Sequence, residues 1–170
     1  MDIQEIKQKV WWSYLEEGQR CLIEESLLLL AREENGVDNF HDYAFIAFPI
    51  AKAYEGFLKK LFLDLGLINK FQYESDHFRI GKSLNPGLPK RFRNDSWVYD
   101  DLTKLCQSAQ LPQFLWNVWK ESRNIIFHWF PKEKNFIDLA QARKRVELVI
   151  EAIEMSLLEC NLLPREHRFS

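Results

Sequence analysis

The chain has 170 residues, of which 46% are hydrophobic and 14% aromatic, and its formal net charge at pH 7 is −2. This composition excludes intrinsic disorder of the whole chain and predicts one domain, residues 1–170, around a single core. The slightly acidic balance excludes a general attraction to nucleic acid, so any such binding must come from a local basic patch.

The cysteines and the N-terminus bear on the compartment. Cys21, Cys106 and Cys160 are odd in number, far apart, and part of no CxxC or Cys/His cluster, which argues against a disulfide framework or a zinc site. Residues 1–9 have neither the basic start nor the apolar core of a signal peptide, and no segment approaches about 18 uninterrupted apolar residues. We therefore expect a soluble, cytoplasmic protein without a membrane span, metal or cofactor.

Apolar residues recur at steps of three and four along most of the chain, which has only 6 Gly and 6 Pro. This pattern predicts an all-α protein, an up-and-down bundle of about five helices. The first expected helix spans residues 3–34, with Gly18 as a weak point and a stop at 35–36. The second spans 42–67, where Pro49 either kinks the helix or begins it, and we expect the kink.

Residues 69–95 show no convincing helical period and predict a loop longer than is usual in a compact domain. Such loops are often functional, although a flexible insertion is an equally good interpretation. Within this loop, residues 77–93 contain no acidic side chain and five basic ones: Arg79, Lys82, Lys90, Arg91 and Arg93. This segment is the local patch that could contact phosphates.

Three further helices are expected in the second half of the chain. A short one spans 96–109, and the next spans 112–129, with Pro112 at a favourable first position. The last begins at Asp138, whose carboxylate can cap the first turn while Gln141 lies three residues on, and it continues to about residue 162.

A helical wheel of residues 112–130 gives one broad apolar face, which we expect to be core. The opposite face carries a continuous polar line, formed by Asn117, Glu121, Asn124 and His128. Beside this line, away from the core, the wheel places two aromatic and two basic side chains: Trp116, Lys120, Arg123 and Phe127. Large exposed aromatic side chains usually indicate a partner. Arg123 and His128 lie about 140° apart, so they would not touch in a regular helix.

Arg123, Asn124 and His128 form the pattern R-N-x-x-x-H near the end of this expected helix. Taken singly, a histidine or an arginine near a helix C-terminus is ordinary, because the helix dipole favours both. The pattern resembles the RX4-6H motif of the HEPN superfamily, whose members are all-helical bundles of about this size with the motif late in the chain. Residues 51–68, AKAYEGFLKKLFLDLGLI, resemble the second helix of stand-alone HEPN proteins related to the RNase LS toxin.

The resemblance implies a metal-independent endoribonuclease, acting as a toxin or as a defence or stress RNase. It implies that Arg123 stabilises the phosphorane, that His128 is a general acid or base, and that Asn124 orients the phosphate or the imidazole. These roles suit the side chains, because imidazole exchanges protons near neutral pH and a guanidinium can hold two phosphate oxygens. Attack by the RNA 2′-OH would leave 2′,3′-cyclic phosphate ends.

The resemblance also implies partners. HEPN nucleases typically pair so that both motifs line one cleft, and such a homodimer would bury Trp116, Lys120 and Phe127. An antitoxin protein is a further partner that the resemblance allows. From their charge, and not from the resemblance, the basic residues of 77–93 are expected to hold the RNA.

Two alternatives remain open from the sequence. One is a HEPN fold without catalysis, a dimerisation or docking module for a protein such as a nucleotidyltransferase. Some HEPN toxins carry RX4HxY, whose tyrosine the partner modifies, but Phe130 occupies that position here, which argues against this regulation. The other is a helical adaptor whose residues 77–93 bind an acidic partner. Glu55 is best interpreted as half of a surface ion pair with Lys59.

Overall fold

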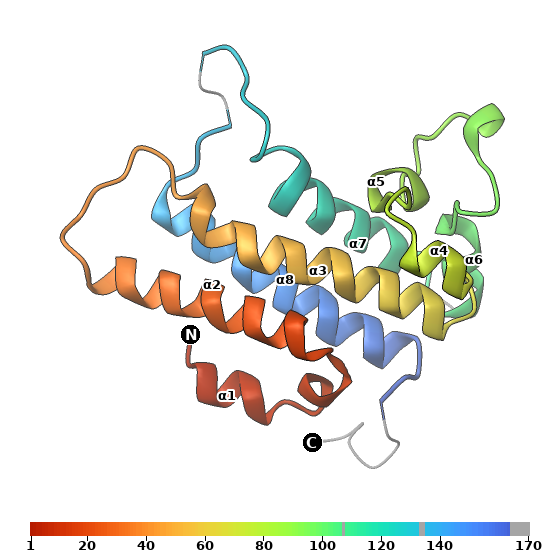
Figure 1. The fold of residues 1–170 in the computed structure, drawn as a ribbon, viewed down its shortest axis with the longest axis horizontal. Coiled ribbons are helices and arrows are strands. Elements are labelled where there is room, and N and C mark those ends of the chain that lie inside the picture. Colours follow the sequence, from red (N-terminus) through yellow and green to blue (C-terminus); the bar gives the residue numbers. More distant parts are fainter. Residues whose placement is uncertain (107, 133–134, 164–170) are drawn as a thin grey trace.

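The structure of the protein, a computed structural model, describes residues 1–106, 108–132 and 135–163. Its bundle consists of α2 (Glu17–Asn35), α3 (Ala44–Asp64), α7 (Leu111–Trp119) and α8 (Leu139–Glu159). These helices alternate in direction in chain order (Figure 1), and α3 and α8 each contact both α2 and α7. The described residues contain no strand, so the predicted all-α bundle is confirmed.

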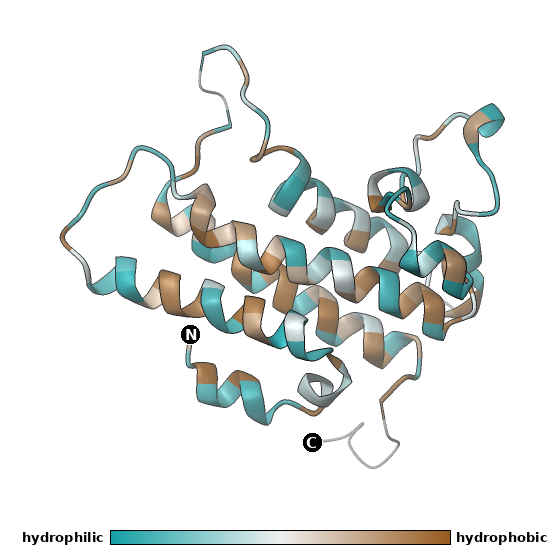
Figure 2. Ribbon diagram, in the orientation of Figure 1, coloured by the Kyte–Doolittle hydropathy of each residue, from teal (hydrophilic) through white to brown (hydrophobic). Residues whose placement is uncertain are grey.

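The core forms where the apolar faces of these helices meet. Hydrophobic and hydrophilic residues alternate along α2 and α3 (Figure 2), which is the pattern of helices with one buried face. Fully buried side chains come from every long helix and include Ile23, Phe57, Leu61, Leu115 and Ile153. None of the helices in the described residues is both long and apolar enough to cross a lipid bilayer.

The first expected helix is broken into pieces. α1 (Ile3–Gln8) is followed by the 3-10 turn η1 (Val10–Tyr14), and only then by α2. The prediction of one helix over residues 3–34 is therefore wrong. Figure 1 shows α1 folded back beside α2, whereas a continuous helix would project past the end of the bundle. Folding back buries Trp11, which is only 1% exposed.

The break lies before Gly18, not at it. Glu16 and Gln19 cap the start of α2, and the backbone N–H of Glu16 donates to Oε1 of Gln19 at 3.2 Å. Gly18 lies in the first turn of the helix, where its missing side chain costs little. The predicted stop at 35–36 is confirmed, because α2 ends at Asn35.

The second long helix runs through Pro49, so Pro49 does not begin it. α3 starts five residues earlier, at Ala44, and ends at Asp64, three residues before the expected end at 67. Gly66 follows with a φ of +69°, a left-handed conformation that favours glycine and ends the helix.

The expected long loop contains short helices. They are α4 (Lys70–Glu74), α5 (Ile80–Ser83) and the 3-10 turn η2 (Lys90–Phe92), and α6 (Tyr99–Leu105) follows within the predicted range 96–109. The prediction of a loop without helices over 69–95 was wrong, because elements of about one turn are too short to show a period. Packing holds this segment in place: Ile80 is 1% exposed, and a side chain on Gly81 would come within 3.1 Å of Trp119 Cζ2.

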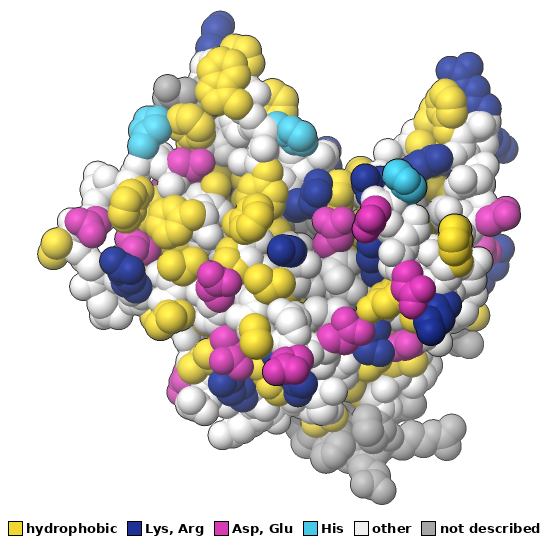
Figure 3. Space-filling model, in the orientation of Figure 1, with side chains coloured by type: hydrophobic (Ala, Val, Ile, Leu, Met, Phe, Trp, Pro, Cys, Tyr) yellow, Lys and Arg dark blue, Asp and Glu magenta, His cyan; other side chains and the backbone are white. Residues whose placement is uncertain are grey.

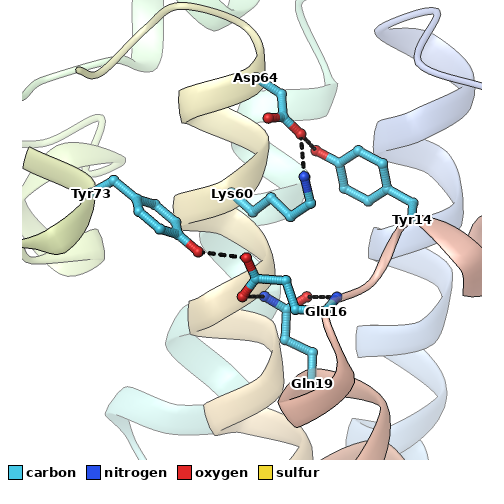
Figure 4. A network of polar contacts seen from close by, with 6 residues as sticks. All are labelled: Tyr14, Glu16, Gln19, Lys60, Asp64 and Tyr73. Atoms are coloured by element: carbon cyan, nitrogen blue, oxygen red, sulfur yellow. Dashed lines mark hydrogen bonds and ion pairs between the residues drawn. The ribbon is translucent and has the colours of Figure 1, made fainter. Parts of the chain in front are cut away.

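A polar network ties the N-terminal turns to α3 and α4 (Figure 4). The Tyr14 hydroxyl donates to Asp64 Oδ2 at 2.6 Å, and Lys60 Nζ donates to the same oxygen at 2.7 Å. The Tyr73 hydroxyl donates to Glu16 Oε1 at 2.8 Å. Burial, and then the Glu16 carboxylate, raise the pKa of Tyr73 to about 12. Its hydroxyl therefore remains a donor throughout the neutral pH range.

The helix expected at 112–129 ends early. α7 stops at Trp119 and continues as η3 (Lys120–Asn124), a π-helical turn in which the N–H of Ile125 donates to the Lys120 carbonyl at 3.0 Å. A π turn holds an extra residue, so the wheel loses its register beyond residue 119. In the described residues between η3 and α8, turns, a bend and irregular backbone follow.

The last helix begins as expected and closes on a disulfide. The Gln141 N–H donates to Asp138 Oδ1 at 2.7 Å, which confirms the predicted cap, and α8 ends at Glu159 rather than near residue 162. Cys160, at its C-cap, is bonded to Cys106 at the C-cap of α6. The expectation against a disulfide was therefore wrong, because 54 residues of separation conceal two helix ends that meet in space. Because two of the three cysteines are paired, the cysteines give no argument for a reducing compartment.

Candidate active site

One outward face of α3 carries charged residues at steps of three and four, namely Lys52, Glu55 and Lys59. They line an open pocket of about 380 Å³, together with Gly56, Phe48, Arg123 and Phe127. Figure 3 shows a notch between two projections of the molecule, with basic and acidic side chains together near its floor. The projections are the loop after η3 and the segment between α5 and α6 (Figure 1).

Arg123 is held by Glu55 across the helix boundary. Its Nε donates to Glu55 Oε2 at 3.0 Å, and its Cζ lies 5.4 Å from the centroid of the Trp119 ring. The two side chains are 39% and 27% exposed, so the pair contributes at most about 1 kcal/mol to stability. Its main effect is to orient the guanidinium.

The terminal nitrogens of Arg123 remain available. Arginine has five N–H donors, and within the described residues only Nε makes a hydrogen bond. A guanidinium held by Nε and stacked near an aromatic ring can present its outer edge to two oxygens of a phosphate. The π turn aims this residue, since such turns displace side chains from the regular helical register and occur frequently at functional sites.

His128 lies outside any helix, contrary to the wheel. It is exposed, at a bend of the loop after η3, with its ring centroid 6.4 Å from that of Phe130. The side-chain amide of the buried Asn135 donates to the His128 carbonyl, and the Ile137 N–H donates to Asp42 Oδ1 at 3.1 Å. The loop is thus anchored at its base and presents the imidazole to solvent.

The three motif residues are not joined to one another. No hydrogen bond links the side chains of Arg123, Asn124 and His128 within the part of the chain that the structure describes. Asn124 is half-buried at the end of η3. The continuous polar line expected from Asn117 to His128 does not form, because the helix has ended before His128.

Some basic side chains of residues 77–93 bond within the protein, and others face solvent without such bonds to the described part of the chain. Arg93 is engaged internally: its Nε donates to the Leu88 carbonyl at 2.8 Å, and its Cζ lies 3.9 Å from the Trp97 ring centroid. Arg79 is exposed, but its guanidinium donates to the carbonyls of Asp76 and Phe78, the latter at 3.2 Å. Lys82, Lys90 and Arg91 are exposed, the last two on η2 at the tip of a projection.

The residues expected at a dimer interface are less exposed than the wheel indicates. Trp116 stacks on Trp119 with ring centroids 5.5 Å apart, and Phe127 contacts Phe48 at 5.2 Å. Both are half-buried against the core, while Lys120 is exposed. Trp129, the last residue of the helix expected at 112–129, is 73% exposed. The positions of Phe127 and Trp129 follow from the lost helical register, whereas Trp116, within α7, is covered because it stacks on Trp119.

Reasoning from the sequence missed the role of Glu55 and its neighbours. Glu55 pairs with Arg123 rather than with Lys59, whose Nζ lies 3.5 Å from the Ser75 carbonyl oxygen. The steps from Lys52 to Glu55 to Lys59 were the available signal, since they predict one exposed charged face. That the face meets Arg123 depends on how α3 packs beside η3, which no spacing along the chain reveals.

Two observations complete the site. The described residues contain no group of three or more His, Cys, Asp and Glu side chains placed to hold a metal ion. Comparison of the chain with protein-family models, with curated proteins and with solved structures found no match.

Proposed function

We propose that the protein is a metal-independent endoribonuclease of HEPN type, a toxin or a defence or stress RNase, that cleaves RNA through its own 2′-OH. The observation that carries the proposal is the placement of Arg123. Its guanidinium is oriented by Glu55 and lines an open pocket together with Lys52 and Lys59. This is where an enzyme needs fixed positive charge to stabilise a phosphorane.

The chemistry requires a base and an acid as well as the arginine. A base removes the proton of the 2′-OH, the 2′-oxygen attacks phosphorus, and the 5′-oxygen leaves as it accepts a proton. His128 supplies one of these proton transfers, and Asn124 positions the phosphate or the imidazole. The products are a 2′,3′-cyclic phosphate and a 5′-OH.

The separation of Arg123 and His128 is consistent with a shared cleft in a homodimer. In an isologous pair, each surface patch meets its own copy, so His128 of one protomer can approach Arg123 of its partner. The exposed position of His128 on a projecting loop suits such an approach.

A gel assay tests the proposal. Total RNA is incubated in EDTA with the wild-type protein, with His128→Ala and with His41→Ala, which removes another exposed loop histidine. We expect wild type and His41→Ala to cleave, and His128→Ala to be slower by about 100-fold or more. Cleavage that persists in folded His128→Ala, or that EDTA abolishes, would contradict the assignment.

A second candidate function is a non-catalytic HEPN docking module that binds an antitoxin or another protein. It is favoured by a second, more apolar pocket of about 400 Å³, whose lining includes Leu29, Phe45, Phe48 and Phe127. Phe48 is 54% exposed there. Absence of RNA cleavage by the wild-type protein would favour this function.

A further inference from the structure

A separate pocket of about 280 Å³ adjoins the candidate active site. Lys59 connects the two: it lines the active-site pocket, while its Nζ lies 3.5 Å from the Ser75 carbonyl oxygen and 5.8 Å from the Phe78 ring centroid. Both Ser75 and Phe78 line the second pocket. An RNA strand bound at Arg123 can therefore continue past Lys59 into this pocket.

An exposed aromatic ring stands at the second pocket. Phe71, from α4, lines this pocket and is 83% exposed. A phenyl ring this exposed gains little of the stabilisation that burial would give, and large exposed aromatic side chains usually indicate a binding partner. Its backbone is well held, because Asn69 and Gln72 cap α4 reciprocally and Gln72 Nε2 donates to Ser96 Oγ at 3.2 Å. The chain thus fixes the base of a flat apolar surface that faces solvent.

The polar lining offers a cation and hydrogen-bonding groups. Lys82 is exposed, and within the described residues its ammonium makes no hydrogen bond or ion pair. Asn94 Oδ1 accepts from the Ser96 N–H at 3.3 Å, so its amide NH₂ remains a donor toward the pocket. A ring, a cation and an amide within one pocket match the three parts of a nucleotide: base face, phosphate and base edge.

We propose that this pocket binds one unpaired nucleotide of a single-stranded RNA substrate, with its base stacked on Phe71 and its phosphate at Lys82. The inference rests on the proposed function, because it describes how the same site holds its RNA beyond the cleaved bond. Stacking and phosphate contact do not use the 2′-OH, however. The pocket therefore also binds single-stranded DNA, which the enzyme cannot cleave.

Uncleavable DNA lets the pocket be tested apart from catalysis. The probe is a short single-stranded DNA that contains 2-aminopurine, whose fluorescence falls when the base stacks on an aromatic ring. It is titrated into the wild-type protein, Phe71→Ala, Phe71→Trp and Phe92→Ala. Phe92 is the control, since it is a 50% exposed phenylalanine on η2 that does not line the pocket.

We expect quenching by wild type, Phe71→Trp and Phe92→Ala, and about tenfold weaker binding with little quenching by Phe71→Ala. Lys82→Ala should lower the slope of log affinity against log salt by about one phosphate contact. No binding by wild type, or equal effects of Phe71→Ala and Phe92→Ala, would overturn the inference. Retained, Phe71-dependent DNA binding without RNA cleavage would instead overturn only the proposed nuclease function.

Discussion

At the scale of single residues, the site depends on one arginine and the carboxylate that orients it. Arg123 would be a mobile side chain without Glu55, because a long side chain on a turn has many rotamers. The sequence motif identified Arg123 but not its partner. The motif suggested Arg123, Asn124 and His128 as candidate site residues, whereas the contact between α3 and η3 decides how Arg123 is held.

Glu55→Gln should separate binding from catalysis. Removing the negative charge from a pocket that otherwise contains Lys52, Lys59 and Arg123 strengthens RNA binding, so KM falls. The amide orients the guanidinium less firmly, so kcat falls by about tenfold. Steady-state cleavage kinetics measure both, with Glu147→Gln on α8 as a control for loss of a surface charge. A rise in KM with an unchanged kcat would show that Glu55 does not position Arg123.

Gly81→Ala should destabilise the protein by about 1–3 kcal/mol, because the new methyl group overlaps the Trp119 ring. Gly18→Ala is the matched control: no atom lies within 4 Å of its added Cβ, and alanine is the better helix former, so stability should rise slightly. Urea denaturation of both variants provides the measurement. Equal midpoints would contradict the close packing of α5 on α7.

At the scale of elements, the sequence predicted helices well where one element has one amphipathic face and its own caps. The helix from Asp138 is such a case, with a reciprocal cap at its start. The range 3–34 was not such a case, because the chain breaks there so that Trp11 can pack into the core. The prediction of a helix over 112–129 was also wrong, since α7 gives way to a π turn at Lys120, which leaves no local signal in the sequence.

The disulfide joins the ends of α6 and α8, and no pattern in the sequence indicates that these two helix ends meet. Linking residues 54 apart restricts the unfolded chain, and loop-closure entropy gives about 4 kcal/mol of stabilisation. We expect Cys106→Ser and Cys160→Ser each to lower the free energy of unfolding by up to this amount. The exposed Cys21 is the control, and Cys21→Ser should have little effect. Insensitivity of the wild-type unfolding midpoint to a reducing agent would contradict a stabilising disulfide.

At the scale of the whole molecule, two projections flank a notch (Figure 3), and the candidate site residues come from two different parts of the chain, the π turn η3 and the loop after it. Arg123 lines the open pocket beside α3, while His128 lies on the loop after η3. A single copy does not join them by any hydrogen bond among the described residues. This arrangement is the structural reason to expect a second copy in the active assembly.

Mixing two inactive variants tests the shared cleft. If Arg123 of one protomer acts with His128 of its partner, a heterodimer of Arg123→Ala and His128→Ala retains one complete pair. We expect the mixture to recover a substantial fraction of wild-type RNA cleavage after subunit exchange, while each variant alone stays inactive. Light scattering should give twice 20.4 kDa. A monomer with full activity would exclude the shared cleft.

The most direct test of the central claim is the chemical nature of the cleaved ends. Wild-type protein is incubated in EDTA with a defined RNA and with the same strand carrying one 2′-deoxynucleotide at the cleavage position, and the fragments are weighed by mass spectrometry. The proposed mechanism predicts a 2′,3′-cyclic phosphate on one fragment, a 5′-OH on the other, and no cleavage at the deoxynucleotide. Cleavage at that position, or fragments with a 5′-phosphate, would contradict attack by the 2′-OH and the roles assigned to Arg123 and His128.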